Sequence, residues 1–287
     1  MNTVNQTFDW SRFTATLRKE LVENKRAILF TLLGTYGLLT MIMIFGNLSV
    51  GSNGSVREMT EIIQNFYLPQ KFVFLILSTA AVIAASLAFR KLTNKSGRIE
   101  MFTSPSSTLE KFLVNSLIYV IGYIVAFFIC AQLADLTRIA VLRLFAGENF
   151  IVPGPVNFLH LIPDAVNGFG FGSDIPGDAN KWFSINFYLG MLAGPGLFLL
   201  GSIVWPRLSL LKTFAAVYGV QTILGIILVI VVMNINDMES AGWWIINHME
   251  HIAIATLVIT VLEIILFWGL SWYLFKRKDV ISLKWWK

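Results

Sequence analysis

Six apolar stretches, each about as long as a membrane-crossing helix, constrain this chain more than any other feature of its sequence. A helix needs about 20 residues to cross roughly 30 Å of hydrocarbon, and it satisfies its own backbone polar groups. Apolar residues make up 56% of the 287 positions and charged residues only 14%, far from a soluble domain. We predict an all-α polytopic membrane bundle, a single transmembrane domain over 1–287, with spans at about 26–45, 71–89, 112–133, 184–204, 214–233 and 252–275.

Lys and Arg gather in alternate loops of this plan. Five lie in each of the segments 1–26, 90–111 and 276–287, two lie in 206–212, and the remaining loops hold five of the 22. Because positive loops stay in the cytoplasm, both termini are predicted to be cytoplasmic. The net charge of +5 then reflects topology and attraction to an anionic inner leaflet, and it requires no nucleic acid.

The N-terminal segment 7–25 carries an apolar stripe before the first predicted span. Trp10, Phe13 and Leu17 recur at helical spacing, with charged residues elsewhere on the helix. This pattern predicts an amphipathic helix lying in the inner membrane interface. Two interpretations remain open: a simple membrane anchor, or an elbow helix through which a permease contacts a cytoplasmic partner.

The inner loop 90–111 ends in a helix-start signal. Ser107 and Glu110 have the spacing of a capping box, so a helix is predicted to begin at Thr108 and to continue into the third span. The stretch just before it displays Met101, Phe102 and several hydroxyl groups below the membrane. It is either a well-capped helix start and nothing more, or a segment that inserts into a cleft on a partner protein.

The longest predicted outer segment is 135–183. Apolar residues recur at helical spacing over 136–145, with Arg138 and Arg143 elsewhere, which predicts a short interfacial helix. The remainder is rich in Gly and Pro and is expected to form irregular loop. Its glycine run lacks the Lys-Ser or Lys-Thr ending of a phosphate loop.

Motifs for chemistry are lacking elsewhere too. No nucleotide-binding, serine-hydrolase or zinc-protease motif occurs in the sequence, so the chain is not predicted to be an enzyme, and ATP-driven work would need another chain. The spacing of His248 and His251 would suit two metal ligands on one helical face. With only His160 as a further candidate, we interpret them as surface residues and predict no metal.

Glu263 is the one acidic residue near the middle of a predicted span. Placing a carboxylate there costs about 2.5 to 3.5 kcal/mol on insertion scales. It is either a proton or substrate contact in a pathway, or a protonated group in an interhelical hydrogen bond. Gln221 is a candidate packing partner, because Gly219 and Gly225 beside it permit close helix approach. In the fourth span, Pro195 between two glycines predicts a kink or a local break.

Two short strings add a family likeness to this six-span plan. The inner loop reads Ser-Pro-Ser-Ser-Thr-Leu-Glu-Lys-Phe over 104–112, and Leu-Gly-Ser-Ile-Val-Trp over 200–205 leads to Leu-Lys-Thr at 211–213. With both ends inside and an amphipathic N-terminal helix, the chain resembles the permease subunits of bacterial ABC exporters of the type-two class. The likeness extends over nearly the whole chain.

The resemblance implies a permease of the bacterial inner membrane that dimerises, as a homo- or heterodimer, and exports a hydrophobic or amphipathic substrate. It implies two separate cytoplasmic ATPase subunits, which would bind ATP and Mg, while this chain would bind no cofactor. The N-terminal helix would help to dock the ATPase. The expected ATPase-coupling residues are Phe102, Ser104, Ser107, Leu109 and Glu110.

Two other functions are compatible with the sequence. The first is a non-transporting assembly or sensory protein that recognises a ligand or protein through 135–183. The second is a proton-coupled carrier centred on Glu263, in which Glu263→Gln would abolish activity without harming expression. The sequence offers no second acid or histidine within the predicted spans for a proton relay.

Overall fold

A computed structural model describes residues 8–51, 73, 75–145, 155, 179–233, 243–244 and 247–278. These residues form helices and short connections, with no strand among them, which confirms the all-α prediction. The helices are α1 (Trp10–Glu23), α2 (Lys25–Gly51), an apolar helix Leu75–Leu87, η1 (Arg90–Thr93), α4 (Lys95–Thr103), α5 (Thr108–Ser116), η2 (Leu117–Gly122), α6 (Tyr123–Phe145), α8 (Ala179–Val204), α9 (Ser209–Met233) and α11 (Met249–Lys276).

Five helical stretches of this structure are long and apolar enough to cross a membrane, which confirms a membrane-embedded protein. They are Lys25–Phe45, Thr108–Leu144, Lys181–Val204, Ser209–Ile227 and Met249–Lys276. They match five of the six predicted spans. The other predicted span, 71–89, contains the shorter helix Leu75–Leu87, and its first residues lie outside the described part of the chain. A sixth crossing therefore stays a prediction.

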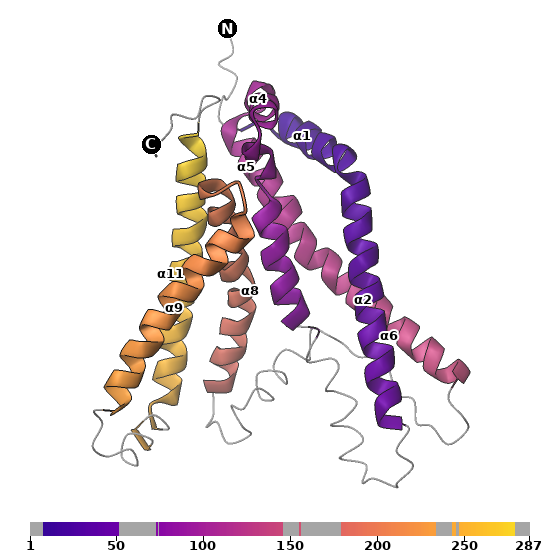
Figure 1. Ribbon diagram of the computed structural model, residues 1–287, viewed down its shortest axis with the longest axis vertical. Coiled ribbons are helices and arrows are strands. Elements are labelled where there is room, and N and C mark those ends of the chain that lie inside the picture. The colour runs from indigo at the N-terminus through magenta and orange to yellow at the C-terminus, as the bar shows by residue number, and fades with distance from the viewer. Residues whose placement is uncertain are drawn as a thin grey trace.

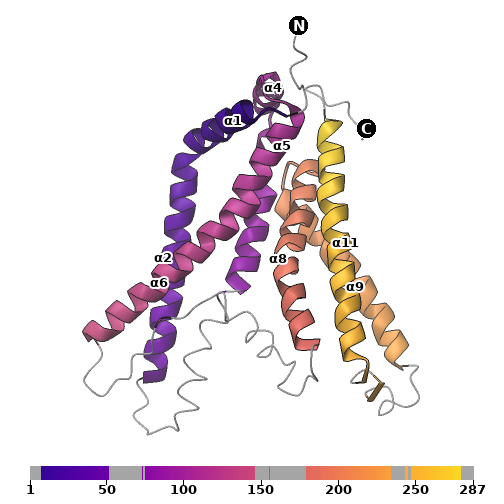
Figure 2. The same ribbon diagram turned by 180° about the vertical axis from the view of Figure 1, so that it is seen from behind.

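The segments with most of the basic residues lie together at one end of the molecule, which we call the α1 end. It consists of α1, η1, α4, the start of α5, the turn 205–208 and the last turn of α11 (Figures 1 and 2). The spans extend from this end, and α1 lies across them at a steep angle to α2. The grouping agrees with the predicted topology, while the side of the membrane on which this end lies remains a prediction.

The third span is one long helix with an unusual middle. The capping box on Ser107 is present and α5 begins at Thr108, as predicted. The chain then forms a six-residue π-helical stretch, η2, before α6 continues to Phe145. Residues 136–145 are helical as predicted, but they continue α6 without a break and do not form a separate helix; the point at which this span leaves the membrane stays a prediction.

A buried ion pair explains why the helix does not stop. Arg138 donates from Nε to Asp135 Oδ1 at 2.8 Å, one helical turn away, and both side chains are completely buried. Arg138 was predicted to lie on the polar side of a short interfacial helix, but it is completely buried and paired with Asp135 within α6. Asp135 also lies within a candidate membrane span. The sequence analysis found no acid other than Glu263 in the predicted spans, and that statement was wrong.

Two apolar clusters hold the helices together. One joins α2, the helix Leu75–Leu87 and α6 through Leu39, Leu77 and Phe127. The other lies at the α1 end, where Phe89, Phe112 and Phe275 meet with ring centroids 4.8 to 6.0 Å apart. These clusters place the start of α5 against both α11 and the helix that leads into η1.

Helix α8 packs along α11 and is not broken by its proline. Pro195 lies inside the continuous helix Ala179–Val204, so the predicted local break does not occur. A Cβ added at Gly196 would lie 2.6 Å from Trp268 Nε1, which shows how closely the two helices approach. Trp268 Nε1 also donates to the carbonyl of Leu192 at 3.4 Å.

Helix α9 is attached only at its start. Ser209 and Thr213 are buried, and a Cβ at Gly201 of α8 would overlap the Thr213 hydroxyl. From Phe214 to Ile227 every residue except Val217 is exposed. Most side chains of this helix are therefore left exposed by the described part of the chain.

Candidate functional site

Glu110 joins the beginnings of α1 and α5 and is completely buried. Its Oε1 accepts hydrogen bonds from the Asp9 backbone N–H at 2.7 Å and from Arg12 Nη2 at 3.1 Å. Its Oε2 accepts from the Ser107 backbone N–H at 2.7 Å. Charge-assisted hydrogen bonds of this length are among the stronger polar contacts in proteins. We call Asp9, Arg12, Ser107 and Glu110 the α1–α5 junction.

Local helix capping explains why the chain folds this way. Ser107 Oγ accepts from the Glu110 backbone N–H at 3.2 Å, while the Glu110 carboxylate returns to the Ser107 N–H. Asp9 caps α1 in the same manner, accepting from Ser11 N at 2.8 Å and Arg12 N at 3.2 Å. The hydrogen bond from the Ser11 hydroxyl and those from the two backbone N–H groups lower the pKa of Asp9. Two ordinary caps are thus linked through one carboxylate.

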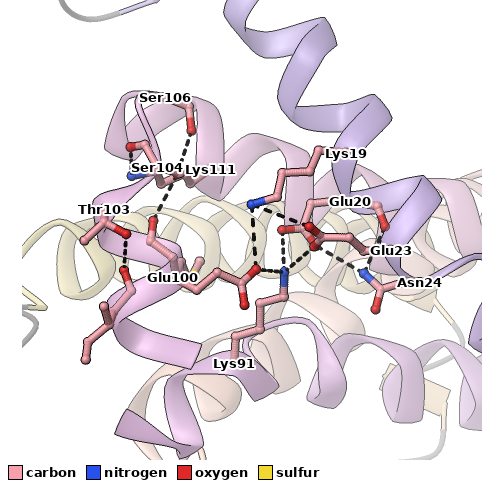
Figure 3. Close-up of polar contacts among 12 residues, drawn as sticks. Lys19, Glu20, Glu23, Asn24, Lys91, Glu100, Thr103, Ser104, Ser106 and Lys111 are labelled. Carbon is pink, nitrogen blue, oxygen red and sulfur yellow. Dashed lines mark hydrogen bonds and ion pairs between the residues drawn. The ribbon is translucent and has the colours of Figure 1, made fainter. Parts of the chain in front are cut away.

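A second polar cluster, the Lys91 cluster, joins the other end of α1 to η1 and α4. Lys91 Nζ contacts Glu20 Oε1 at 2.8 Å, Glu23 Oε2 at 3.0 Å and Glu100 Oε1 at 3.1 Å. Lys19 lies 3.5 Å from Glu23 and 3.7 Å from Glu100. Figure 3 shows these side chains converging from three elements.

The charges of the Lys91 cluster are mutually stabilised. Burial disfavours the Lys91 ammonium, but its hydrogen bonds with the three carboxylates outweigh burial and raise the pKa of Lys91 above its ordinary value. The hydrogen bond from Lys91 lowers the pKa of Glu100. A Cβ at Gly97 would collide with the Lys91 carbonyl oxygen, so a glycine lets α4 approach η1 closely.

The two clusters together fix α1 to the segment 90–110. One holds the start of α1 and the other holds its last turn, and both include residues about 70 to 100 positions away in sequence. The first turn of α5, and with it the start of the third span, therefore lies inside this assembly.

The predicted coupling residues lie together at the α1 end. Phe102 is half-buried and stacks on Phe275 of α11, with centroids 6.1 Å apart. Ser104 Oγ donates to the Met101 carbonyl at 3.2 Å, and Lys111 Nζ donates to the Ser104 carbonyl at 3.1 Å. Phe102, Ser104, Ser107 and Leu109 are all partly exposed, whereas Glu110 is not. Contact between this segment and an ATPase stays a prediction.

The three predicted elbow residues differ in how far they are buried. Phe13 is buried and Leu17 is half-buried, whereas the Trp10 side chain is 69% exposed. The Trp10 and Phe13 rings stack with centroids 5.5 Å apart, and Phe8 lies beside both. The N-terminal half of α1 therefore offers an aromatic surface beside a buried anchor.

Sequence reasoning missed Arg12 and Lys91 as parts of this site. Lys91 was counted only as a loop charge that sets topology, and Arg12 only as the polar side of an amphipathic helix. The available signal was the pair of acids Glu20 and Glu23, one turn apart on the side that α1 turns toward η1.

Glu263 and Gln221 are both exposed, and no hydrogen bond joins either side chain to another of the residues described. His248 stacks on Trp244, with centroids 4.5 Å apart, and meets the His251 ring edge-on. Within the ranges described, no three His, Cys, Asp or Glu residues gather as metal ligands. His160 lies outside those ranges.

The chain matches no protein-family model, no curated protein and no solved structure.

Proposed function

We propose that this chain is the membrane-spanning permease subunit of an ABC exporter in the bacterial inner membrane, with both termini in the cytoplasm. It moves a hydrophobic or amphipathic substrate with energy from a separate ATPase subunit. The observation that carries this proposal is the α1–α5 junction, in which a buried carboxylate fastens a surface helix to the first turn of a spanning helix.

Coupling requires a stiff connection from a docking surface to the spans. The segment 101–107 continues directly into α5 through the capping box, and Phe102 also contacts α11 through Phe275. A push on this segment therefore reaches two spanning helices at once. The π-helical stretch η2 follows directly after the nine residues of α5, and such stretches are common at functional positions of helices.

The docking surface is formed by exposed groups at the α1 end. Trp10 is exposed, and so are Thr103 and Pro105 between α4 and α5. Exposed aromatic side chains at interfaces contribute disproportionately to binding. Since the sequence has no nucleotide-binding motif, the ATPase that docks here is a separate chain.

Co-purification tests the proposal. The tagged chain is extracted from its native membrane in mild detergent, and the chains that accompany it are identified by mass spectrometry. We expect a Walker-motif ATPase with the wild type, and at least a tenfold lower yield of it with Trp10→Ala. Trp243→Ala is the matched control, because Trp243 is 62% exposed and comes shortly before α11 in the chain, whose start lies at the end of the molecule away from α1 (Figure 1).

Absence of any ATPase from the wild-type preparation would reject the exporter function. Recovery of only a partner that needs residues of the segment 135–183 would support an assembly or sensory protein in its place. An equal loss of ATPase with both tryptophan variants would show that the α1 end is not the docking surface.

A further inference from the structure

The basic side chains at the α1 end fall into two groups. Arg12, Lys19 and Lys91 each pair with a carboxylate. Arg98 of α4 and Lys278, which follows α11, form no ion pair and no side-chain hydrogen bond with any residue that the structure describes. The acids described at this end are all engaged already, namely Asp9, Glu20, Glu23, Glu100 and Glu110. The described chain therefore supplies no counter-ion for the second group.

The contact between α4 and α11 brings Arg98 and Lys278 together. Phe102 stacks on Phe275 with ring centroids 6.1 Å apart. Arg98 lies four positions before Phe102 in α4, and residues four apart share one face of a helix. Lys278 lies three positions after Phe275, and its N–H donates to the Phe275 carbonyl at 3.1 Å, so it continues the last turn of α11. Each cation thus lies about one turn from the same ring contact.

Both cations are half-buried although their charges are alike. The Nε atom of Arg98 is buried and has no hydrogen-bond partner in the described part of the chain. Burial lowers the pKa of Lys278 below its ordinary value, and the nearby charge of Arg98 lowers it further. Like charges repel one another more strongly where water is partly excluded. An anion bound by both side chains removes this repulsion.

The surroundings of the two cations favour a phosphate that is carried by a lipid. A guanidinium offers a planar set of donors to phosphate oxygens, and an ammonium adds a compact charge. Ile99, next to Arg98, and Tyr273, near the end of α11, are both exposed, and Arg277 lies 4.2 Å from the centroid of the Tyr273 ring. Tyrosine near the end of a spanning helix is typical of the headgroup region. Cations beside exposed apolar and aromatic surface match a phospholipid.

We propose that Arg98 and Lys278 form a binding site for a phosphate group, and that this group belongs to an anionic phospholipid of the surrounding leaflet. Such a site differs from the general attraction of basic loops to an anionic leaflet, because it depends on two named side chains. It is also independent of the exporter function.

Lipid-dependent stability tests the site. The full chain is purified in lipid-free dodecyl maltoside, and its melting temperature is followed by tryptophan fluorescence as phosphatidylglycerol is added. A ligand that binds only the folded state raises the melting temperature. We expect phosphatidylglycerol to do so in the wild type, with a half-maximal concentration at least tenfold higher in the double variant Arg98→Gln with Lys278→Gln.

The double variant Lys25→Gln with Arg26→Gln is the matched control. It removes the same two charges from exposed positions at the start of α2, and it should respond to phosphatidylglycerol as the wild type does. A tenfold loss in both double variants would show general attraction to anionic lipid and would overturn the site. So would a wild type that phosphatidylglycerol fails to stabilise.

Inorganic phosphate and phosphatidylcholine identify the source of the phosphate. We expect both to stabilise the wild type more weakly than phosphatidylglycerol at the same concentration, because the first has no apolar chains and the second has no net charge. Equal stabilisation by inorganic phosphate, lost in the variant of Arg98 and Lys278, would keep the phosphate site and reject a lipid as its source.

Stability without lipid gives an outcome of the opposite sign. In lipid-free detergent Lys278→Gln removes one of two neighbouring like charges, so this variant should be no less stable than the wild type. In saturating phosphatidylglycerol it should be less stable. Destabilisation under both conditions would show that Lys278 has its partner within the chain and would overturn the proposal.

Asp279 follows Lys278 directly and lies outside the described residues. Asp279→Asn should leave the response to phosphatidylglycerol unchanged. A lower lipid-free melting temperature in Asp279→Asn, together with tighter binding of phosphatidylglycerol, would identify Asp279 as the counter-ion of the two cations and would overturn the proposal.

None of these measurements needs an ATPase. A chain that binds phosphatidylglycerol through Arg98 and Lys278 but co-purifies no ATPase keeps this site and loses the exporter function. A chain that co-purifies its ATPase but shows no such lipid response loses this site alone.

Discussion

Two carboxylates of this protein lie in opposite environments. Glu110 is completely buried and accepts hydrogen bonds from three groups on two helices. Glu263 is exposed in the middle of an apolar helix and has no hydrogen bond within the part of the chain that the structure describes. The Glu110 carboxylate is therefore satisfied within one chain, whereas no residue that the structure describes satisfies the Glu263 side chain.

The comparison extends to the helices around each residue. At the α1 end, side chains of α1, η1, α4 and α5 neutralise one another's charges. In α9, by contrast, the described side chains that are buried lie near its start, at Ser209 and Thr213, and Gly219 and Gly225 have empty space beside them. Substitutions at the α1 end should thus lower the stability of the chain, and substitutions on the exposed part of α9 should leave that stability almost unchanged.

The largest effect is expected from Glu110→Ala. Removing the carboxylate leaves the Arg12 guanidinium and two backbone N–H groups without their common acceptor, a loss of roughly 3 kcal/mol for a buried charged partner. We expect a lower melting temperature in detergent, measured by tryptophan fluorescence, together with faster proteolysis of α1. Glu263→Ala is the control and should leave the melting temperature of the monomer unchanged. Equal destabilisation by both substitutions would show that the buried Glu110 contributes no more to the stability of the chain than the exposed Glu263.

Gly201→Ala should follow, with a cost of about 1 to 3 kcal/mol for overpacking. The added methyl group overlaps the Thr213 hydroxyl, where α9 is attached to α8. Gly219→Ala places the same methyl group in empty space on α9 and should be neutral for the monomer. Thermal unfolding of the two variants side by side measures the difference. A cost at Gly219 equal to that at Gly201 would show that α9 is packed along its length.

The Lys91 cluster should respond to pH with a definite sign. The pKa of Lys91 is raised from 10.5, so its stabilisation is fully present below that pH and is lost as pH rises through the higher folded value. The pKa of Glu100 is lowered from 4.5, so its stabilisation is present above that pH and is lost on further acidification. Proteolysis of α1 should therefore be constant from about pH 6 to 9 and accelerate below about pH 4.5.

Lys91→Met tests whether the Lys91 cluster, and not some other group that titrates in acid, causes the faster proteolysis of α1 at low pH. The variant should show faster proteolysis of α1 at neutral pH and a smaller acceleration in acid, because the carboxylates have already lost their common cation. An acid response as large as that of the wild type would exclude the cluster as its source.

Lys19→Ala should have the smallest effect, below about 1 kcal/mol. Lys19 pairs with Glu23 and Glu100 at 3.5 and 3.7 Å, and all three side chains are substantially exposed, a situation in which ion pairs contribute little. Melting temperatures in low and high salt should be nearly the same for this variant and the wild type. A loss comparable to that of Lys91→Met would mean that the cluster acts as one unit.

Sequence patterns predicted the features that depend on near neighbours or on the bilayer itself. Hydropathy found the long helices, because a span must be apolar over a fixed length. The capping box at Ser107 and Glu110 was found because its two residues are three positions apart. The contacts of Glu110 with Asp9 and Arg12, about 100 positions away, have no local signature.

The partners of charged residues were the feature least predictable from the sequence. Arg138 was placed on the polar side of a short interfacial helix, but it is buried and paired with Asp135 one turn earlier within α6. Lys91 was assigned to topology although it also binds α1. The sequence gives the number of charged residues in a loop, whereas only the folded structure shows which of them form ion pairs.

The π-helical stretch Leu117–Gly122 sets the rotational phase of the third span. Each residue of an α-helix turns the chain by about 100°, so a wider stretch offsets everything beyond it about the helix axis. The side of α5 that faces α1 and the side of α6 that faces α2 are consequently out of phase with a single unbroken α-helix. Deleting one residue there would bring the two halves back into phase and turn Arg138 away from its buried side. The apolar side of α5 and the apolar side of α6 are therefore not continuous along the helix. The amphipathic pattern of this span has to be analysed separately before and after η2.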